Sequence, residues 1–240
     1  MLPDFYGGFV MFRWSGKSGV RDWPLGESRL FSWASPLLAV LACFFLSACG
    51  SVSSHRSGSG FFDTVVIDAG HGGHDRGARA VKGNHEKVLA LDIAQRVSRI
   101  LRASGLRVVE TRTGDYFVPL DQRVSFASRT RDSIFVSIHL NWARRSRASG
   151  VETFFYSPRS SRLAANIQRE IVRPYGAKNR GIKPGRYYVL RKNKRPAVLV
   201  ELGFISNANE NNSLQKSHIR QKLAEAVARG ILAEKNGRFP

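Results

Sequence analysis

The stretch Val65-Val66-Ile67-Asp68-Ala69-Gly70-His71-Gly72-Gly73-His74-Asp75 joins an apolar run to a glycine-rich turn. Its first three residues are β-branched and apolar, which favours a buried strand. The glycines that follow let the backbone turn sharply and approach another group closely. His71 is therefore delivered at the carboxyl end of a strand, which is where ligands collect in α/β folds. We predict that this histidine is the first ligand of a metal ion, and that the rest of the chain supplies the others.

The chain beyond this stretch has the length and composition of one globular domain. Of its 240 residues, 42% are hydrophobic and 23% are charged, but the net charge is +20. After the first sixty residues or so, about 180 remain, enough for a single hydrophobic core. The excess of positive charge predicts binding to a polyanion, either nucleic acid or an anionic cell wall or membrane surface. Charge alone does not choose between these partners.

The N-terminus is typical of an exported bacterial lipoprotein. Residues 33–48 are mostly apolar and small, follow positive charges, and are too short for a comfortable membrane span. Leu46-Ser47-Ala48-Cys49 resembles a lipobox, in which Cys49 becomes the lipidated N-terminus; a plain signal peptide or an uncleaved anchor is the alternative. We therefore predict a signal segment over residues 1–49, a Ser/Gly-rich tether over 50–61 and a catalytic domain over 62–236. Export argues against nucleic acid and predicts a lipid-anchored envelope protein, on the periplasmic side of the outer membrane where a cell has one.

In the predicted domain, strands alternate with helices. Apolar residues at helical spacing follow Glu86, and Ser104-Gly105 ends that helix. Further helices are predicted over residues 120–131, 161–172 and 219–232, and strands over residues 64–68, 106–110, 133–138, 150–156, 187–190 and 197–202. This order predicts an α/β fold in a single domain, with helices on both faces of the sheet. The most apolar strands, at 65–67, 134–138 and 197–200, are expected at the sheet centre.

Polar residues at or just beyond the ends of these apolar strands suggest a zinc site. Both cysteines, Cys43 and Cys49, precede the domain, so a metal there must be held by histidine and carboxylate side chains. Hydrolytic zinc usually has three protein ligands and one open position for water. We expect the ligands to be His71, Glu86 and His139, with Glu201 as the base that takes the proton of the zinc-bound water.

Each of these residues also has a structural interpretation. A histidine after a strand is often only hydrogen-bonded, and Glu86 suits a helix N-terminus whether or not a metal is present. Glu201 could form a salt bridge with one of the many arginines. His74 and His85 are rival ligands by residue type, whereas the positions of His55 and His218 make them poor candidates. Spacing therefore proposes the site without deciding which histidines bind.

Six linked motifs resemble one enzyme family. In order, they contain His71, Glu86, His139, the segment Gly150-Val-Glu-Thr-Phe-Phe, the segment Asn179-Arg-Gly-Ile-Lys, and Pro196-Ala-Val-Leu-Val-Glu201-Leu-Gly-Phe-Ile-Ser-Asn. They look like the zinc-dependent N-acetylmuramoyl-L-alanine amidases of bacterial cell walls. The resemblance covers residues 63–235 and implies a six-stranded mixed sheet, one Zn²⁺ ion held by His71, Glu86 and His139, and Glu201 as the catalytic base.

The resemblance also implies a reaction, namely hydrolysis of the amide between N-acetylmuramic acid and L-alanine in peptidoglycan. A zinc peptidase acting within the stem peptide and a non-catalytic wall-binding module remain the alternatives. His74 would then be a loop residue near the site, and Asp68 and Asn141 could orient the ligands or cap turns. A monomer is expected.

Two features depart from the family pattern. Regulated members carry an extra helix that plugs the zinc cleft until an activator removes it. Here only residues 157–161 separate the fourth strand from the next helix, so we predict an open site that needs no activator. The loop over residues 142–149 contains Arg144, Arg145 and Arg147, which either meet acidic wall components or are simply solvated.

Overall fold

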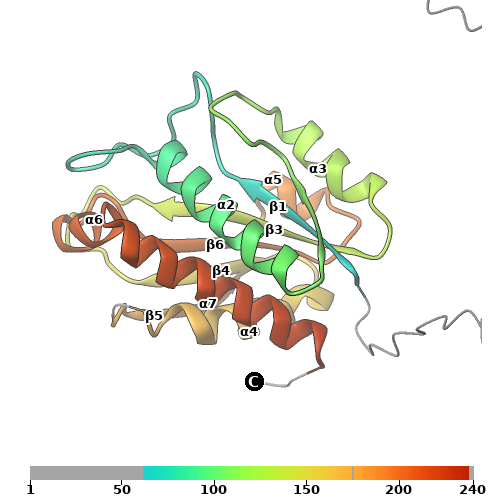
Figure 1. Ribbon diagram of the computed structural model, residues 1–240. Helices are drawn as coiled ribbons and strands as arrows, with labels where there is room; N and C mark the ends of the chain where they lie inside the picture. The colour runs from blue at the N-terminus through green and yellow to red at the C-terminus, as the bar shows by residue number, and fades with distance from the viewer. Residues whose placement is uncertain (1–61, 175, 238–240) are drawn as a thin grey trace, which may run out of the picture. The chain divides into compact units, whose positions relative to one another are not determined.

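The strands form one six-stranded mixed sheet in the order β2-β1-β3-β6-β4-β5 (Figure 1). The computed structural model describes residues 62–174 and 176–237; the predicted signal segment, Cys49 and nearly all of the tether lie outside them. The strands are β1 (Thr64–Ala69), β2 (Arg107–Glu110), β3 (Ser133–Asn141), β4 (Val151–Phe155), β5 (Asn179–Pro184) and β6 (Ala197–Phe204). The first three and β6 are parallel, whereas β4 is antiparallel to β6 and parallel to β5. The predicted fold class is confirmed.

The apolar strands lie where their composition predicts. Every residue of β1 and β6 is buried, as are the first six residues of β3. A strand covered on both faces cannot alternate between apolar and polar residues, which is why these three strands read as near-continuous apolar runs. Their carboxyl ends therefore lie side by side at one edge of the sheet.

Helices cover both faces of the sheet (Figure 1). One face is packed by α2 (Glu86–Ala103), α4 (Ser161–Ile171) and α7 (Ser217–Lys235), and the other by α3 (Leu120–Arg129) and α5 (Tyr188–Arg191). A short α6 (Ala208–Leu214) follows β6, and a 3₁₀ turn, η2 (Pro158–Ser160), precedes α4. The larger core contains Leu89, Ile93 and Val97 of α2 against Leu223 and Val227 of α7. None of the helices in the described residues is long and apolar enough to cross a membrane.

One predicted strand is wrong. Residues 188–190 belong to the helix α5, and Tyr187 directly precedes it. The sixth strand of the sheet is instead β5 at Asn179–Pro184, where the sequence predicted no strand. A short apolar run fits a helical turn as well as a strand, and here Val189 and Leu190 pack on the sheet instead of extending it. Because β5 is an edge strand that pairs only with β4, it tolerates the turn-like residues Gly181 and Pro184.

Candidate metal centre

His71 lies two residues beyond the end of β1, in a backbone conformation that residues other than glycine rarely adopt. Its φ angle is 60°, in the left-handed region. Such a conformation costs roughly 1–3 kcal/mol and persists only when the surroundings impose it. The surroundings do so here, because the imidazole Nδ1 pairs with Asp75 Oδ2 at 2.8 Å and the main-chain oxygen accepts a hydrogen bond from Arg123 at 2.7 Å. The contact with Arg123 thus fixes the backbone of His71, and the contact with Asp75 fixes its ring.

Glu86 is the first residue of α2, and its carboxylate is buried. Oε2 accepts the backbone N–H of Ala78 at 2.8 Å, and Oε1 accepts the backbone N–H of Leu140 at 3.0 Å. Burial by itself would raise the pKa of Glu86, but hydrogen bonds with His139 and His71 outweigh it and hold this pKa well below its ordinary value. Glu86 is therefore a fixed, ionised carboxylate with a histidine at each oxygen.

His139 lies in β3, and its ring packs directly over the backbone of Gly70. A Cβ atom at residue 70 would lie 2.3 Å from His139 Cε1, so only glycine leaves room for this ring. A Cβ at Gly77, where φ is +65°, would likewise meet His71 and Glu86 at 2.6–2.7 Å. These two glycines of the loop are needed for the side chains that surround them.

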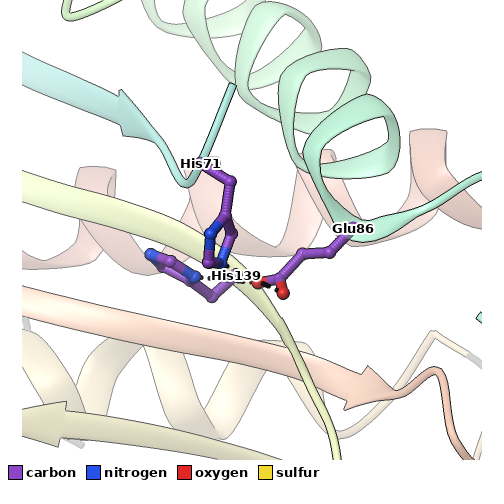
Figure 2. A group of neighbouring side chains, drawn as sticks. All are labelled: His71, Glu86 and His139. Carbon is purple, nitrogen blue, oxygen red and sulfur yellow. Dashed lines mark hydrogen bonds and ion pairs between the residues drawn. The ribbon is translucent and has the colours of Figure 1, made fainter. Parts of the chain in front are cut away.

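His71, Glu86 and His139 point toward one another from the ends of β1 and β3 and the start of α2 (Figure 2). His71 Nε2 is 3.1 Å from Glu86 Oε2, and His139 Nδ1 is 2.8 Å from Glu86 Oε1. One ligand atom from each residue lies within 4.8 Å of the other two, close to the roughly 3–4 Å between ligands of a tetrahedral zinc ion. The structure therefore brings together the three residues that the sequence proposed as ligands.

This group of residues fits a divalent cation chemically. When His71 donates Nδ1–H to Asp75, its Nε2 is an acceptor that faces the acceptor Glu86 Oε2. Two acceptors at 3.1 Å repel each other unless a proton or a metal ion lies between them. Burial lowers the pKa of His71, yet Glu86 and Asp75 outweigh burial and raise it, so cationic charge is favoured there. Two imidazoles and one carboxylate form a set that suits catalytic zinc.

Two residues that the sequence did not single out hold this site in place. Asp75 orients His71, as a carboxylate beside a ligating histidine does in many zinc sites. Arg123, buried in α3, pairs with Asp68 at 2.7 Å and donates to the main-chain oxygens of Ala69 and His71. Asp75 could have been found from its position four residues after His71, whereas no sequence signal marks Arg123.

Asp68 and Asn141, predicted either to orient ligands or to cap turns, contact neither histidine by hydrogen bond. Asp68 is buried, accepts from Thr111 and Ser137, and acts on the His71 turn through Arg123. Asn141 donates to Glu152 and accepts the backbone N–H of Trp142. The orienting contact of Asp68 is therefore indirect, and Asn141 binds its own turn and the neighbouring strand β4.

Glu201 lies in β6 as the register partner of His139 in β3, and it is buried. It lines the same cavity of about 520 Å³ as His71, Glu86 and His139. Its Oε2 is buried and has no hydrogen-bond partner among the residues that the structure describes. Burial, reinforced by the charges of Glu86 and Glu152, raises the pKa of Glu201 well above its ordinary value. Within residues 62–174 and 176–237 this carboxyl forms no salt bridge, so the structural alternative considered for it finds no support there.

The rival histidines lie outside this group. His74 is exposed and packs on Phe117 with ring centroids 4.2 Å apart. His85 precedes α2, and its buried Nδ1 has no hydrogen-bond partner within residues 62–174 and 176–237. His218 is in the first turn of α7, and His55 lies outside the described residues. Only His71 and His139 share the group with Glu86 in the part of the chain that the structure describes.

Comparison with known proteins places the chain in a family of hydrolases. Residues 65–233 match the family described as N-acetylmuramoyl-L-alanine amidase. The chain is 38% identical over 203 residues to the uncharacterized protein YqiI of Bacillus subtilis, covering 83% of this chain and 95% of YqiI. It is also 38% identical over 175 residues to the N-acetylmuramoyl-L-alanine amidase LytC of Bacillus subtilis, covering 71% of this chain but 35% of LytC.

The solved structures that are similar in both fold and sequence include two amidases. The catalytic domain of the amidase CwlV from Bacillus (Paenibacillus) polymyxa var. colistinus has a TM-score of 0.69 and 38% identity, covering 71% of this chain and 96% of that domain. The amidase AmiC2 of Nostoc punctiforme has a TM-score of 0.69 and 40% identity, covering 72% of this chain and 96% of that chain. With the family match over residues 65–233, these similarities show that the chain belongs to the N-acetylmuramoyl-L-alanine amidase family.

Proposed function

We propose that the protein is a zinc-dependent amidase that hydrolyses the bond between N-acetylmuramic acid and L-alanine in peptidoglycan. The observation that carries the proposal is the meeting of His71, Glu86 and His139 beside Glu201 in one cavity, in a member of this family. His71, Glu86 and His139 would hold the metal. When bound, zinc supplies a Lewis acid that lowers the pKa of a bound water toward about 7 and polarises the substrate carbonyl.

Glu201 is the general base in this proposal. It accepts a proton from the attacking water as oxygen bonds to the lactyl carbonyl carbon, and it returns that proton to the leaving amine nitrogen as the amide bond breaks. The raised pKa suits the proton-accepting half of this transfer, because an ionised carboxylate that binds a proton more tightly is a stronger base. Its unpartnered Oε2 leaves an oxygen available to the water.

The exposed side chains at the rim of the cavity favour a substrate that carries a glycan. Five of its lining side chains are large, apolar and substantially exposed, although apolar groups of this size are usually buried: Phe117, Leu120, Trp142, Tyr187 and Tyr188. Aromatic rings offer flat apolar faces with polar edges, onto which the apolar faces of sugar rings can pack. This surface favours an amidase acting at the sugar–peptide junction over a peptidase acting within the stem peptide.

The N-terminal segment fits a protein that works at the cell envelope. A signal segment over residues 1–49, lipidation at Cys49 and a tether over 50–61 would hold the domain near the wall, and the net charge of +20 favours anionic wall components. The tether lets a membrane-anchored domain reach its substrate.

Digestion of purified peptidoglycan tests the proposal. The purified full chain is incubated with sacculi with and without a chelator, and the released peptides are analysed by mass spectrometry. Peptides with a free L-alanine amino terminus, released only without chelator and again after zinc is restored, are the expected result. Products cut within the stem peptide would instead identify a zinc peptidase, and no release under any condition would favour a binding module.

A further inference from the structure

A second cavity, of about 760 Å³, begins where the metal cavity ends. Ala78 and Trp142 line both cavities, and the backbone N–H of Ala78 bonds the carboxylate of Glu86. We call this second cavity the basic groove. Its other lining residues include Arg79, Arg144 and Ser206. A substrate held at the metal centre can therefore extend past Trp142 into the basic groove.

The walls of the basic groove are tied to one short segment after β6. The backbone N–H of Val81 donates to the main-chain oxygen of Ile205 at 3.1 Å, and that of Ala143 donates to Ser206 Oγ at 3.0 Å. Asn207 Nδ2 then donates to the main-chain oxygen of Ser146 at 2.9 Å. Both walls are thus fixed relative to each other and to β6, which carries Glu201. The groove is formed before any substrate arrives.

The charge of the groove is entirely positive. None of its lining residues is acidic, and Arg79 and Arg144 are both exposed. Among residues 62–174 and 176–237, neither guanidinium has an acidic partner within 4.0 Å or a hydrogen bond. Arg123 and Arg180, by contrast, are paired, with Asp68 and Glu152 respectively. Two unpaired guanidinium groups on a rigid groove form a carboxylate-binding surface.

We infer that the basic groove binds the peptide arm of the substrate and that Arg79 and Arg144 recognise its first free carboxylate. This inference rests on the proposed function. The residue after L-alanine in peptidoglycan is a D-glutamate whose α-carboxyl is either free or amidated. A free α-carboxylate lies close to the scissile amide and complements the two guanidinium groups. The glycan is then left to contact the apolar rim side chains Phe117, Leu120, Tyr187 and Tyr188. The substrate would therefore bind in a single orientation, with its peptide in the basic groove and its glycan on the rim.

Two muramyl dipeptides that differ only in this carboxyl test the inference. The α-carboxyl of D-glutamate is free in one and amidated in the other, and the γ-carboxyl is blocked in both. The full chain is expected to have a lower KM for the acidic substrate. Arg79→Gln and Arg144→Gln are each expected to raise that KM about tenfold with kcat little changed, and to leave the KM for the amidated substrate alone. Arg145→Gln, in the same loop but not lining the groove, is the matched control and should change neither constant.

A binding measurement separates this inference from the proposed chemistry. Calorimetric titration of the full chain with L-alanyl-D-glutamate and with L-alanyl-D-isoglutamine, both with the γ-carboxyl blocked, requires no turnover. Tighter binding of the acidic dipeptide, lost in Arg79→Gln and Arg144→Gln but kept in Arg145→Gln, supports the groove assignment even if the chain proves not to be an amidase. Equal binding of the two dipeptides, or an equal loss in all three variants, overturns it. Circular dichroism checks that each variant is folded.

Discussion

Glu201 on β6 and His139 on β3 are register partners, so that the proposed base and a proposed ligand project from adjacent strands into one cavity. The same register continues to Glu152 on β4, which pairs with Glu201 from the other side. The position of the proposed base relative to the proposed ligand His139 is therefore set by main-chain hydrogen bonds of the sheet. Removing the Glu201 carboxylate should leave His71, Glu86 and His139 where they are.

Glu201→Gln is expected to abolish proton transfer while zinc still binds. General base catalysis is worth about 10²- to 10⁴-fold, so kcat should fall by that factor. The measurement is the rate of peptide release from peptidoglycan, paired with zinc content by atomic absorption. His139→Ala, as the comparison, should lose zinc and activity together. A Gln variant that keeps full activity would rule Glu201 out as the base.

The raised pKa of Glu201 predicts that the metal-free protein loses stability as pH rises. The folded state holds this proton more tightly than the unfolded state, so its contribution is present at acid pH and is lost as pH rises through the raised pKa. Denaturant unfolding of the metal-free protein across this range should show the loss, and Glu201→Gln should show less of it because glutamine does not ionise. Identical pH dependence in the two proteins would contradict the burial of an ionisable carboxyl here.

Gly70→Ala should damage the metal centre without touching a ligand. The new Cβ would lie 2.3–2.7 Å from three ring atoms of His139, so the ring must leave the position in which it contacts Glu86. We expect a stability loss of about 1–3 kcal/mol and weaker zinc binding, measured by thermal unfolding and by competition with a chromophoric chelator. Gly114→Ala is the control, since its nearest neighbour lies at an ordinary 3.4 Å.

Asp68→Asn should be among the most destabilising single changes in β1. It leaves the guanidinium of Arg123, 4% exposed, without its counter-ion, and breaking a buried pair in this way costs about 3–5 kcal/mol. Asp63→Asn breaks an ion pair with Arg107 that is more than half exposed and should cost less than about 1 kcal/mol. Chemical denaturation of both variants gives the comparison, and similar losses in the two would refute the distinction.

The purified protein should need no activator. Between the end of β4 at Phe155 and the start of α4 at Ser161 the chain forms only the turn η2, so no helix from this connection covers the metal cavity. Peptide release from sacculi by the protein alone is the expected result. Activity that appears only after a second protein is added would overturn this prediction.

Most of the fold follows from apolar patterns, and the misses have physical reasons. The runs in β1, β3 and β6 predicted buried strands because both of their faces are covered. The edge strand β5 needs no such run, and its sequence Asn179–Pro184 reads as a turn. The helix α5 is a single turn, too short for its periodicity to be recognised.

The candidate site could be predicted only in part. A histidine after each of two central strands and a carboxylate at the start of a helix suggested a metal site, because parallel strands end at a common edge. By residue type and spacing His74 and His85 were equally good ligands; the family resemblance favoured His71 and His139, and the structure groups these two with Glu86. Asp75 could have been found from its position four residues after His71, but the role of Arg123 depends on contacts with Asp68 and with main-chain oxygens that no sequence pattern indicates.

The sheet order places the last strand of the chain between two earlier ones. Because β6 lies between β3 and β4, the four strands β2, β1, β3 and β6 cannot join β4 and β5 until residue 204 has been made. A chain stopped before Ala197 would hold two half-sheets with open, apolar edges that invite aggregation. A form truncated before Ala197 lacks both Glu201 and the strand that joins the two half-sheets, so we expect it to be inactive and prone to aggregation.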